Sequence, residues 1–339
     1  MGSLLIDVKN VSKTYRSINN ATGFTNKVVS LFKPTSSNYH ALKEISFTLF
    51  SGQSLAIVGP NGAGKSTLIK ILSGIQTADE GDVKVLGVNP YKAKKNLFKS
   101  LGVVFGHKNC LWWDLPLRYS LDMVQPLYDL EPSSFHRDLK EITKLLNIEH
   151  IMDKPVRLLS LGERVKSELA FNLSFKPQLL FLDEPTIGLD ITSKHEIREL
   201  LKKLKKEQAI GYVITSHDMG DIDGYVDDII LLHKGKKQFH SDIDTLKEMI
   251  PSSVRITLFC EHLPTASTLI KDIDELAIKL SIPLKEKHFN DEKCTLEISL
   301  SREDVPGFIR EIAIKLNCPF SVSTPSLEEM LRVKFKEFL

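Results

Sequence analysis

The sequence predicts an α/β protein in two parts, a large domain around a mostly parallel sheet and a small α+β domain after it. First, 339 residues exceed what one hydrophobic core usually holds. Second, short apolar runs such as 55–58 and 179–182 end in glycine or charged residues, as buried parallel strands often do. Third, the composition changes after Met249 and Pro251 marks a boundary, so we expect domains at 1–248 and 249–339.

The composition is that of a soluble globular protein, with 42% hydrophobic and 26% charged residues. The 45 basic and 43 acidic residues leave a formal net charge of +2, which does not call for a nucleic-acid partner. No apolar run reaches the roughly 18 residues needed to cross a bilayer, and the N-terminus lacks a signal-peptide layout. We therefore expect the chain to stay in the cytosol.

The segment 101–116, LGVVFGHKNCLWWDLP, combines an H-x-x-C spacing with both tryptophans of the chain. The four cysteines form no C-x-x-C pair, and no second His/Cys pair could complete a tetrahedral metal site. A metal site is therefore disfavoured. Apolar packing and a docking surface remain as interpretations of this segment.

The most informative stretch is 54–72, SLAIVGPNGAGKSTLIKIL, in which an apolar strand, a glycine-rich loop and an amphipathic helix follow one another. The loop has G-x-x-x-x-G-K-S spacing, whose backbone N–H groups cradle phosphates at the helix N-terminus. Lys65 can reach the β- and γ-phosphates, and the Ser66 hydroxyl is placed to ligate Mg²⁺. The expected nucleotide contacts are Gly59, Asn61, Gly62, Ala63, Gly64, Lys65, Ser66 and Thr67.

Two further apolar runs end in residues that suit phosphate chemistry. The strand at 179–182 closes on Asp183 and Glu184; we expect Asp183 to hold the Mg²⁺ shell and Glu184 to orient or deprotonate the attacking water. Another run ends in Thr215-Ser216-His217-Asp218 and places His217 at a strand tip, where it can contact a γ-phosphate. A P-loop alone fits kinases, GTPases, helicases and transport ATPases. The three strand ends together predict a site that binds and hydrolyses a nucleoside triphosphate.

Five motifs in a fixed order make the chain resemble the ATP-binding subunit of an ABC transporter over about residues 4–245. They are Gly59 to Ser66, Leu159-Ser160-Leu161-Gly162-Glu163, Asp183-Glu184-Pro185, Gly188-Leu189-Asp190 and Ser216-His217-Asp218. More narrowly, the LWWDLP segment, LSLG in place of LSGG and DEPTIGLD resemble ATPases of ABC-2-type exporters, especially a viologen or multidrug branch. The resemblance implies a RecA-like core, an antiparallel β subdomain and a helical subdomain at about 110–175.

The resemblance also assigns roles to single residues. It implies that Tyr15 stacks on adenine, and that Ser160 and Gly162 complete the ATP site of a second ABC ATPase subunit, in a homodimer or a heterodimer. It makes Asp190 the residue that communicates across that dimer and His217 the switch histidine. The implied cofactors are ATP and Mg²⁺. The implied partner is a polytopic ABC-2-type permease, which would hold the chain peripherally at the cytoplasmic side of the membrane.

Two positions depart from the family pattern. His107 stands where the family usually has Gln, and Glu163 ends the signature where Gln is usual. A neutral imidazole can accept a hydrogen bond from metal-bound water or ligate the metal, so we assign His107 to both the catalytic and the metal-binding residues. Glu163 adds negative charge beside a phosphate site. We expect an active ATPase; a regulatory or weakly hydrolysing cassette paired with an active subunit is the alternative.

Two segments lie outside these motifs. Residues 16–40 form an insertion with polar ends and an apolar centre, Val28 to Phe32, which suggests a short amphipathic element in a loop. It packs over the cassette or contacts the permease or membrane; exporters of polysaccharide and teichoic-acid type carry comparable insertions. Residues 254–339 predict a β-α-β-β-α-β ferredoxin-like order with a closing helix at 327–338 and no catalytic residues.

The predicted function is ATP hydrolysis coupled to export of a substrate through a separate permease. A soluble non-transport ABC ATPase is a further alternative. Members of the translation-factor type carry two cassettes, whereas this chain has one P-loop and one signature. Members of the chromosome type insert long coiled coils, for which Lys65 and Ser160 lie too close in sequence. The substrate itself leaves no motif, because this subunit binds nucleotide and moves.

Overall fold

The computed structural model describes residues 2–18, 36–93, 95–106, 109–208, 210–217, 222, 224–248, 253–259, 266–284, 286–290, 295–315 and 319–324. The chain divides into two compact units, Met1–Ile243 and Asp244–Phe338. Helix α9 (Ile243–Glu248) lies at this division. The finer assignment of 1–248 to an ATP-binding domain stays a prediction.

The first unit is built on a central sheet that has six strands within the described residues, in the order β5-β6-β7-β3-β8-β9. Neighbouring strands are parallel except for β8 and β9. The strands are β3 (Ser54–Val58), β5 (Leu101–Phe105), β6 (Leu179–Asp183), β7 (Gly211–Ser216), β8 (Asp228–His233) and β9 (Lys236–Asp242). The apolar strands β3 and β7 are buried along their whole length, as central parallel strands require.

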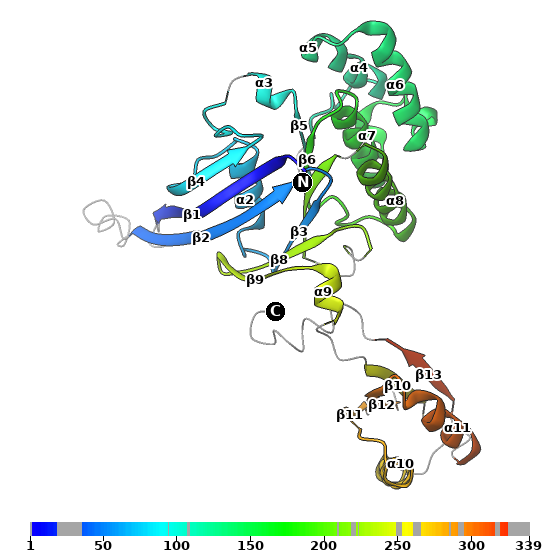
Figure 1. Ribbon diagram of the computed structural model, residues 1–339. Helices are drawn as coiled ribbons and strands as arrows, with labels where there is room; N and C mark the ends of the chain where they lie inside the picture. The colour runs from blue at the N-terminus through cyan, green and yellow to red at the C-terminus, as the bar shows by residue number, and fades with distance from the viewer. Residues whose placement is uncertain are drawn as a thin grey trace, which may run out of the picture. The chain divides into compact units, whose positions relative to one another are not determined.

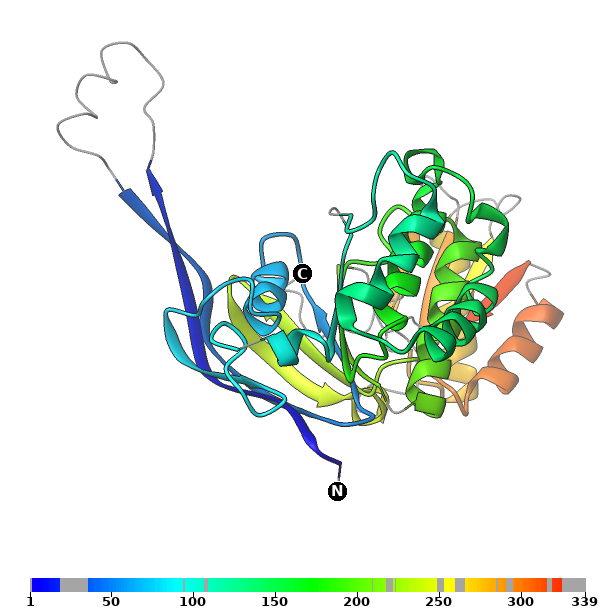
Figure 2. The ribbon, with the colours of Figure 1, turned by 90° about the horizontal axis from the view of Figure 1, so that it is seen from above.

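A second, antiparallel sheet has the order β2-β1-β4, with β1 (Leu4–Ile18), β2 (Ser36–Phe50) and β4 (Glu80–Val85). The β1–β2 pairing continues to Ile18 and Ser36, whereas β4 pairs with β1 only from Ile6 to Ser12. The outer halves of β1 and β2 therefore form a two-stranded arm (Figure 2). The polar ends of the predicted insertion are thus strands and not loop, and its apolar centre lies outside the described residues.

Helices cover the central sheet and form a separate group beside it. They are α2 (Lys65–Leu72), α3 (Lys95–Phe98), α4 (Leu117–Asp122), α5 (Val124–Tyr128), α6 (Pro132–Leu145), α7 (Leu161–Leu173) and α8 (Ile191–Gln208), with the 3-10 helices η1 (Glu149–Ile151) and η2 (Val156–Leu158). Figure 1 shows α4, α5 and α6 grouped together near α7, as the predicted helical subdomain requires. Among the described residues, no helix has the length and apolar character to cross a membrane.

The core of the first unit lies between the two sheets and α2. Leu49, Ile57, Leu68, Ile69 and Val213 are completely buried there. Burial of the apolar face of α2 fixes this helix directly after β3, so the loop between them is held at the edge where the parallel strands end.

The second unit contains a four-stranded antiparallel sheet within the described residues, in the order β11-β12-β10-β13, with helices α10 and α11. Its elements are β10 (Ser253–Phe259), α10 (Ala266–Leu280), β11 (Glu286–Asn290), β12 (Thr295–Ser301), α11 (Val305–Lys315) and β13 (Phe320–Ser323). This is the predicted ferredoxin-like order, and residues such as Ile256, Ile298 and Phe308 form a core of its own. The closing helix predicted at 327–338 lies outside the described residues.

Candidate functional site

The loop after β3 has the shape of a phosphate cradle. Gly64 caps α2 in a left-handed conformation with φ 108°. A Cβ atom at this position would lie 2.4 Å from the Ala41 carbonyl oxygen, so only glycine fits. The tight turn brings the N-terminus of α2 to the edge where β3, β6 and β7 end.

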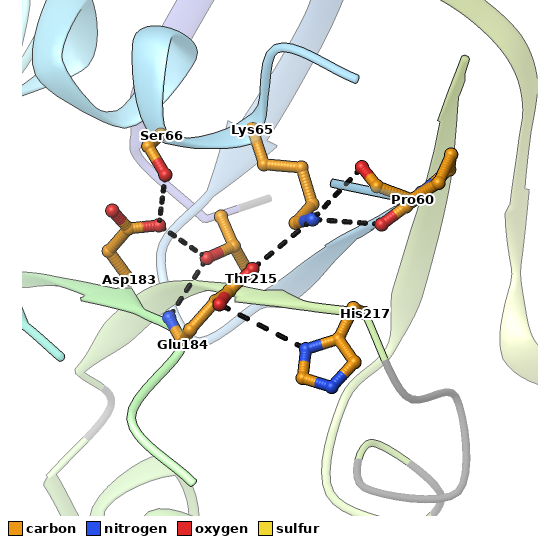
Figure 3. A network of polar contacts seen from close by, with 8 residues as sticks. Pro60, Lys65, Ser66, Asp183, Glu184, Thr215 and His217 are labelled. Atoms are coloured by element: carbon orange, nitrogen blue, oxygen red, sulfur yellow. Dashed lines mark hydrogen bonds and ion pairs between the residues drawn. The ribbon is translucent and has the colours of Figure 1, made fainter. Parts of the chain in front are cut away.

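Lys65, the first residue of α2, points back into this loop (Figure 3). Its Nζ donates hydrogen bonds to the carbonyl oxygens of Gly59 at 2.8 Å and Pro60 at 3.3 Å. The same Nζ lies 3.2 Å from Oε1 of Glu184, and the side chain is only 4% exposed. The ammonium group is thus held in place by oxygens that a phosphate could replace.

The Asp183 carboxylate, at the end of β6, accepts hydrogen bonds from two hydroxyl groups. Its Oδ1 accepts hydrogen bonds from Ser66 Oγ at 3.1 Å and from Thr215 Oγ1 at 2.6 Å. Mg²⁺ prefers carboxylate and other oxygen ligands, so Ser66 and Asp183 fit this ion. Thr215 was not among the predicted site residues, although it stands at the end of the neighbouring strand β7.

Glu184 occupies a strained position with φ 53°, a left-handed conformation that non-glycine residues seldom adopt. Its backbone N–H donates to Thr215 Oγ1 at 3.0 Å. Its two carboxylate oxygens point to different partners, because Oε1 faces Lys65 and Oε2 lies 3.9 Å from His217 Nδ1 (Figure 3). The structure therefore brings together Lys65, Glu184 and His217, as the sequence predicted.

A cavity of about 300 Å³ opens beside Lys65, Asp183 and Glu184, whereas His217 is not part of its lining. Its lining residues are Tyr39, Ala41, Asn61, Gly62, Ala63, Gly64, Lys65, Ser66, Thr67, Asp183 and Glu184. A larger cavity, about 660 Å³, lies between residues of α6 and α8, and its lining contains none of the predicted site residues. We take the smaller cavity as the nucleotide site, because it holds the phosphate loop and both carboxylates.

Two tyrosines stand next to each other at the base of the arm, since Tyr15 pairs with Tyr39 across β1 and β2. Tyr39 lines the nucleotide cavity, and its hydroxyl donates to the Gly62 carbonyl oxygen at 2.6 Å. The Tyr15 hydroxyl instead donates to Gln76 Oε1 at 2.8 Å, and Tyr15 is not part of the cavity lining. Tyr39 was not predicted as a site residue, because it lies within the insertion 16–40, two residues before Ala41, in a stretch without a motif.

The signature segment caps helix α7. Ser160 Oγ accepts a hydrogen bond from the Glu163 N–H at 3.2 Å, and a Glu163 carboxylate oxygen accepts one from the Ser160 N–H at 2.7 Å. This reciprocal arrangement is a capping box. Burial raises the pKa of Glu163, but the hydrogen bonds from Ser160 outweigh it and the pKa lies below its usual value. The extra charge of Glu163 is thus engaged at the start of its own helix.

Gly162 and Asp190 lie side by side. Asp190 caps α8 by accepting hydrogen bonds from Ser193 N at 2.9 Å and Ser193 Oγ at 2.7 Å, and these bonds lower the pKa of Asp190. A Cβ atom on Gly162 would meet Ser193 Oγ at 2.5 Å, so the signature turn packs directly on this cap. Neither Ser160, Gly162 nor Asp190 belongs to the lining of the nucleotide cavity, as far as the described residues define it.

One predicted site position cannot be placed. His107, assigned to catalysis and to the metal, lies outside the described residues. Over the described ranges, no group of three or more His, Cys, Asp or Glu side chains is arranged to hold a metal ion. Cys110, the second residue of the H-x-x-C spacing, is exposed.

The fold and the cavity define a P-loop ATPase, and comparison with known proteins narrows the class. The family model described as ABC transporter matches residues 42–187. Energy-coupling factor transporter ATP-binding protein EcfA2 of Ligilactobacillus salivarius is 30% identical over 260 residues, 74% of this chain and 89% of that protein. The uncharacterized ABC transporter ATP-binding protein YhcH of Bacillus subtilis is 28% identical over 301 residues, 85% of this chain and 88% of that protein.

Solved structures agree on the fold. The dimeric, post-hydrolysis structure of the ATP-binding cassette MJ0796 bound to ADP and Pi superposes with a TM-score of 0.59 at 23% identity, covering 70% of this chain and 99% of that one. The chain belongs to the family of ABC transporter ATP-binding proteins. It is an ABC-type ATPase and binds ATP. The predicted cassette fold is therefore confirmed.

Proposed function

We propose that this chain hydrolyses ATP with Mg²⁺ and thereby drives export of a substrate through a separate ABC-2-type permease. The observation that carries the catalytic part is the network at the strand ends, where Lys65 and His217 lie on opposite sides of the Glu184 carboxylate. The phosphate cradle and the two carboxylates line one cavity, and His217 stands next to Glu184 outside the lining of that cavity. We take residues 1–248 as the ATP-binding domain and 249–339 as an accessory domain that supports dimerisation or regulation.

Each group has a defined task in this proposal. Lys65 binds the β- and γ-phosphates, Glu184 takes a proton from the attacking water, and His217 orients toward the γ-phosphate. Ser66 and Asp183, together with His107, would hold Mg²⁺, which neutralises phosphate charge when bound. Tyr15 stacks on adenine. The backbone N–H groups of Asn61 to Thr67 supply the remaining phosphate contacts.

A second subunit would complete the site. Ser160 and Gly162 stand at the N-terminus of α7, whose partial positive charge suits a γ-phosphate. Because these residues lie away from the nucleotide cavity of their own chain, they are available to the ATP of another copy or of a related chain. Asp190, packed next to Gly162, would report closure of this dimer.

We propose that the permease contacts one exposed surface of this chain. We call it the docking surface and define it as Trp112, Trp113, Leu115, Tyr119 and Met123. These large side chains are 39% to 51% exposed and follow one another within one short segment of the helical subdomain. Exposed apolar clusters of this kind mark interaction sites, and tryptophan suits a partly buried interface. A cytoplasmic helix of a permease is the partner that this surface fits.

Two alternatives have specific support. The 30% identity to a protein named for an energy-coupling factor transporter favours a different kind of permease. The charge of Glu163 beside the signature favours a regulatory cassette with slow turnover, although the capping box engages that charge.

Purification from gently solubilised membranes tests the proposal. A tagged chain is expected to capture a polytopic membrane protein whose sequence is of the ABC-2 type, and the doubly substituted Trp112→Ala, Trp113→Ala chain should lose it while still binding ATP. Capture of an energy-coupling factor permease would replace the export assignment. Complete absence of a membrane protein would overturn transport through a permease.

A further inference from the structure

We propose that Trp113 and Arg164 form a physical link between the docking surface and the signature helix α7, so that binding at one affects the other. Trp113 and Arg164 would act as positioning residues, since neither lines the nucleotide cavity. The inference deepens the proposed function and rests on it for the identity of the outer partner. The link itself can be tested without that partner.

The contact is a cation–π stack. The Arg164 guanidinium carbon lies 4.7 Å from the centre of the Trp113 ring, within the range of such interactions. Trp113 is 47% exposed, so part of the side chain remains open to a partner. Arg164 directly follows the signature residues on α7, and its Nη2 donates to the Leu159 carbonyl oxygen at 3.4 Å.

Arg164 has few other partners. Its buried Nε finds no hydrogen-bond acceptor among the described residues. Glu168, one turn further along α7, is buried, and this raises the pKa of its carboxyl to about 8. Burial disfavours the charged form of Glu168, so Glu168 pairs with the guanidinium less strongly than an exposed carboxylate would. The Trp113 ring is therefore a principal neighbour that fixes the position of Arg164.

Backbone hydrogen bonds connect the same two segments. Arg157 N donates to the Trp113 carbonyl oxygen at 2.9 Å, and Val156 N donates to that of Leu115 at 3.1 Å. Further along, Leu117 N donates to the Lys154 carbonyl oxygen at 3.0 Å. The segment that leads into the signature is thus hydrogen-bonded to the segment that carries the exposed tryptophans. A displacement of one segment moves the other.

Other residues of α7 contact helix α8, so a displacement of α7 would also move α8. Lys166 Nζ lies 2.9 Å from a Glu196 carboxylate oxygen on α8. Gly162 packs on the cap that Asp190 and Ser193 form at the start of α8. A force on the Trp113 ring can therefore reach both Ser160 and Asp190, the residues proposed to face the second subunit.

Tryptophan fluorescence tests the link, because the chain contains only two tryptophans. The Trp112→Phe chain leaves Trp113 as the sole reporter, in a Glu184→Gln background that is expected to trap ATP. Saturating MgATP should change the Trp113 emission, and Arg164→Met should reduce that change at least about twofold, in keeping with a cation–π contact. No emission change with ATP, or a change that Arg164→Met leaves intact, would overturn the link.

Three controls keep the result specific. Arg157→Met removes a nearby arginine that pairs with Asp114 and does not stack on Trp113, so it should leave the Trp113 signal unaltered. Trp113→Phe leaves Trp112, whose signal should not respond to Arg164→Met. If Arg164→Met does not fold, Arg164→Lys takes its place in the test. Lysine keeps the charge without the planar group, so only part of the ATP-dependent change in Trp113 emission should remain.

The outcomes separate the link from the transport assignment. Capture of a permease together with an Arg164-independent signal overturns the link alone. Loss of the permease contact together with an Arg164-dependent signal overturns the transport assignment and leaves the internal link standing.

Discussion

At the scale of single residues, Lys65 contacts three oxygens, two on the P-loop backbone and one on Glu184. Phosphate oxygens would take over these contacts when ATP binds. Replacing Lys65 by Ala should lower ATP affinity roughly 10- to 100-fold, the usual effect of losing a hydrogen bond to a charged group. Equilibrium binding of a fluorescent ATP analogue measures this. Lys70→Ala, on the same helix but outside the cavity, should bind like the unaltered chain.

Tyr39 gives a second prediction at this scale. Its hydroxyl holds the Gly62 carbonyl in the phosphate loop, so Tyr39→Phe should weaken ATP binding about 2- to 10-fold through loss of one hydrogen bond. Tyr15→Phe is the matched control, because its hydroxyl binds Gln76 and the ring available for stacking is kept. Calorimetric titration with ATP compares the two. Equal affinities of Tyr39→Phe and the unaltered chain would contradict the role assigned to Tyr39.

The sequence predicted the residues whose chemistry is tied to local spacing. Lys65, Asp183 and Glu184 follow directly from a strand and a turn, and the structure places them together. Tyr39 and Thr215 could not be predicted in the same way. The place of Tyr39 in the site depends on a strand register that continues across the insertion. The place of Thr215 depends on which strand lies beside β6.

At the scale of elements, helix α7 begins in a capping box whose acidic residue is Glu163. Glu163→Gln keeps an acceptor for the Ser160 N–H and removes the charge. In a Glu184→Gln background, ATP-dependent dimerisation should then tighten about fivefold, since roughly 1 kcal/mol of like-charge repulsion with phosphate is lost. Sedimentation measures the dimer. Glu149 is an exposed acidic residue outside the capping box, so Glu149→Gln is the control. Equal tightening of the dimer in both variants would contradict the role assigned to Glu163.

Glu168, also on α7, predicts a pH dependence of stability. Burial raises the pKa of its carboxyl from 4.5 to about 8, against the opposing influence of Arg164. The folded chain binds this proton more tightly than the unfolded chain. Proton binding at Glu168 therefore contributes fully to the free energy of unfolding below pH 4.5, and this contribution is lost as the pH rises to about 8. Glu168→Gln stays neutral, and its urea-unfolding midpoint should fall less over this range. Parallel profiles of both chains would refute the assignment.

The arm formed by β1 and β2 illustrates where sequence patterns fail for whole elements. Ser36, Ser37 and Asn38 are polar and favour turns, so they were expected to belong to a loop. They pair in register with β1 because the ladder extends outward from the buried part of β2, and tertiary context overrides local propensity. The β-α-β-β-α-β order of the second unit, whose apolar periodicity is regular, was predicted as the structure has it over its described residues.

At the scale of the whole molecule, the nucleotide site and the signature belong to one unit, Met1–Ile243. The second unit has its own core, and the described lining of the nucleotide cavity comes from the first unit. The similarity to YhcH, at 28% identity, spans 85% of this chain.

Steady-state hydrolysis of MgATP by the unaltered chain and by Glu184→Gln tests the central claim most directly. Glu184 is the carboxylate that faces both Lys65 and His217, and we assign it the proton of the attacking water. The account predicts hydrolysis at least about 100-fold slower in the variant, the usual contribution of a general base, with ATP affinity retained. Equal hydrolysis rates in the two proteins would contradict it.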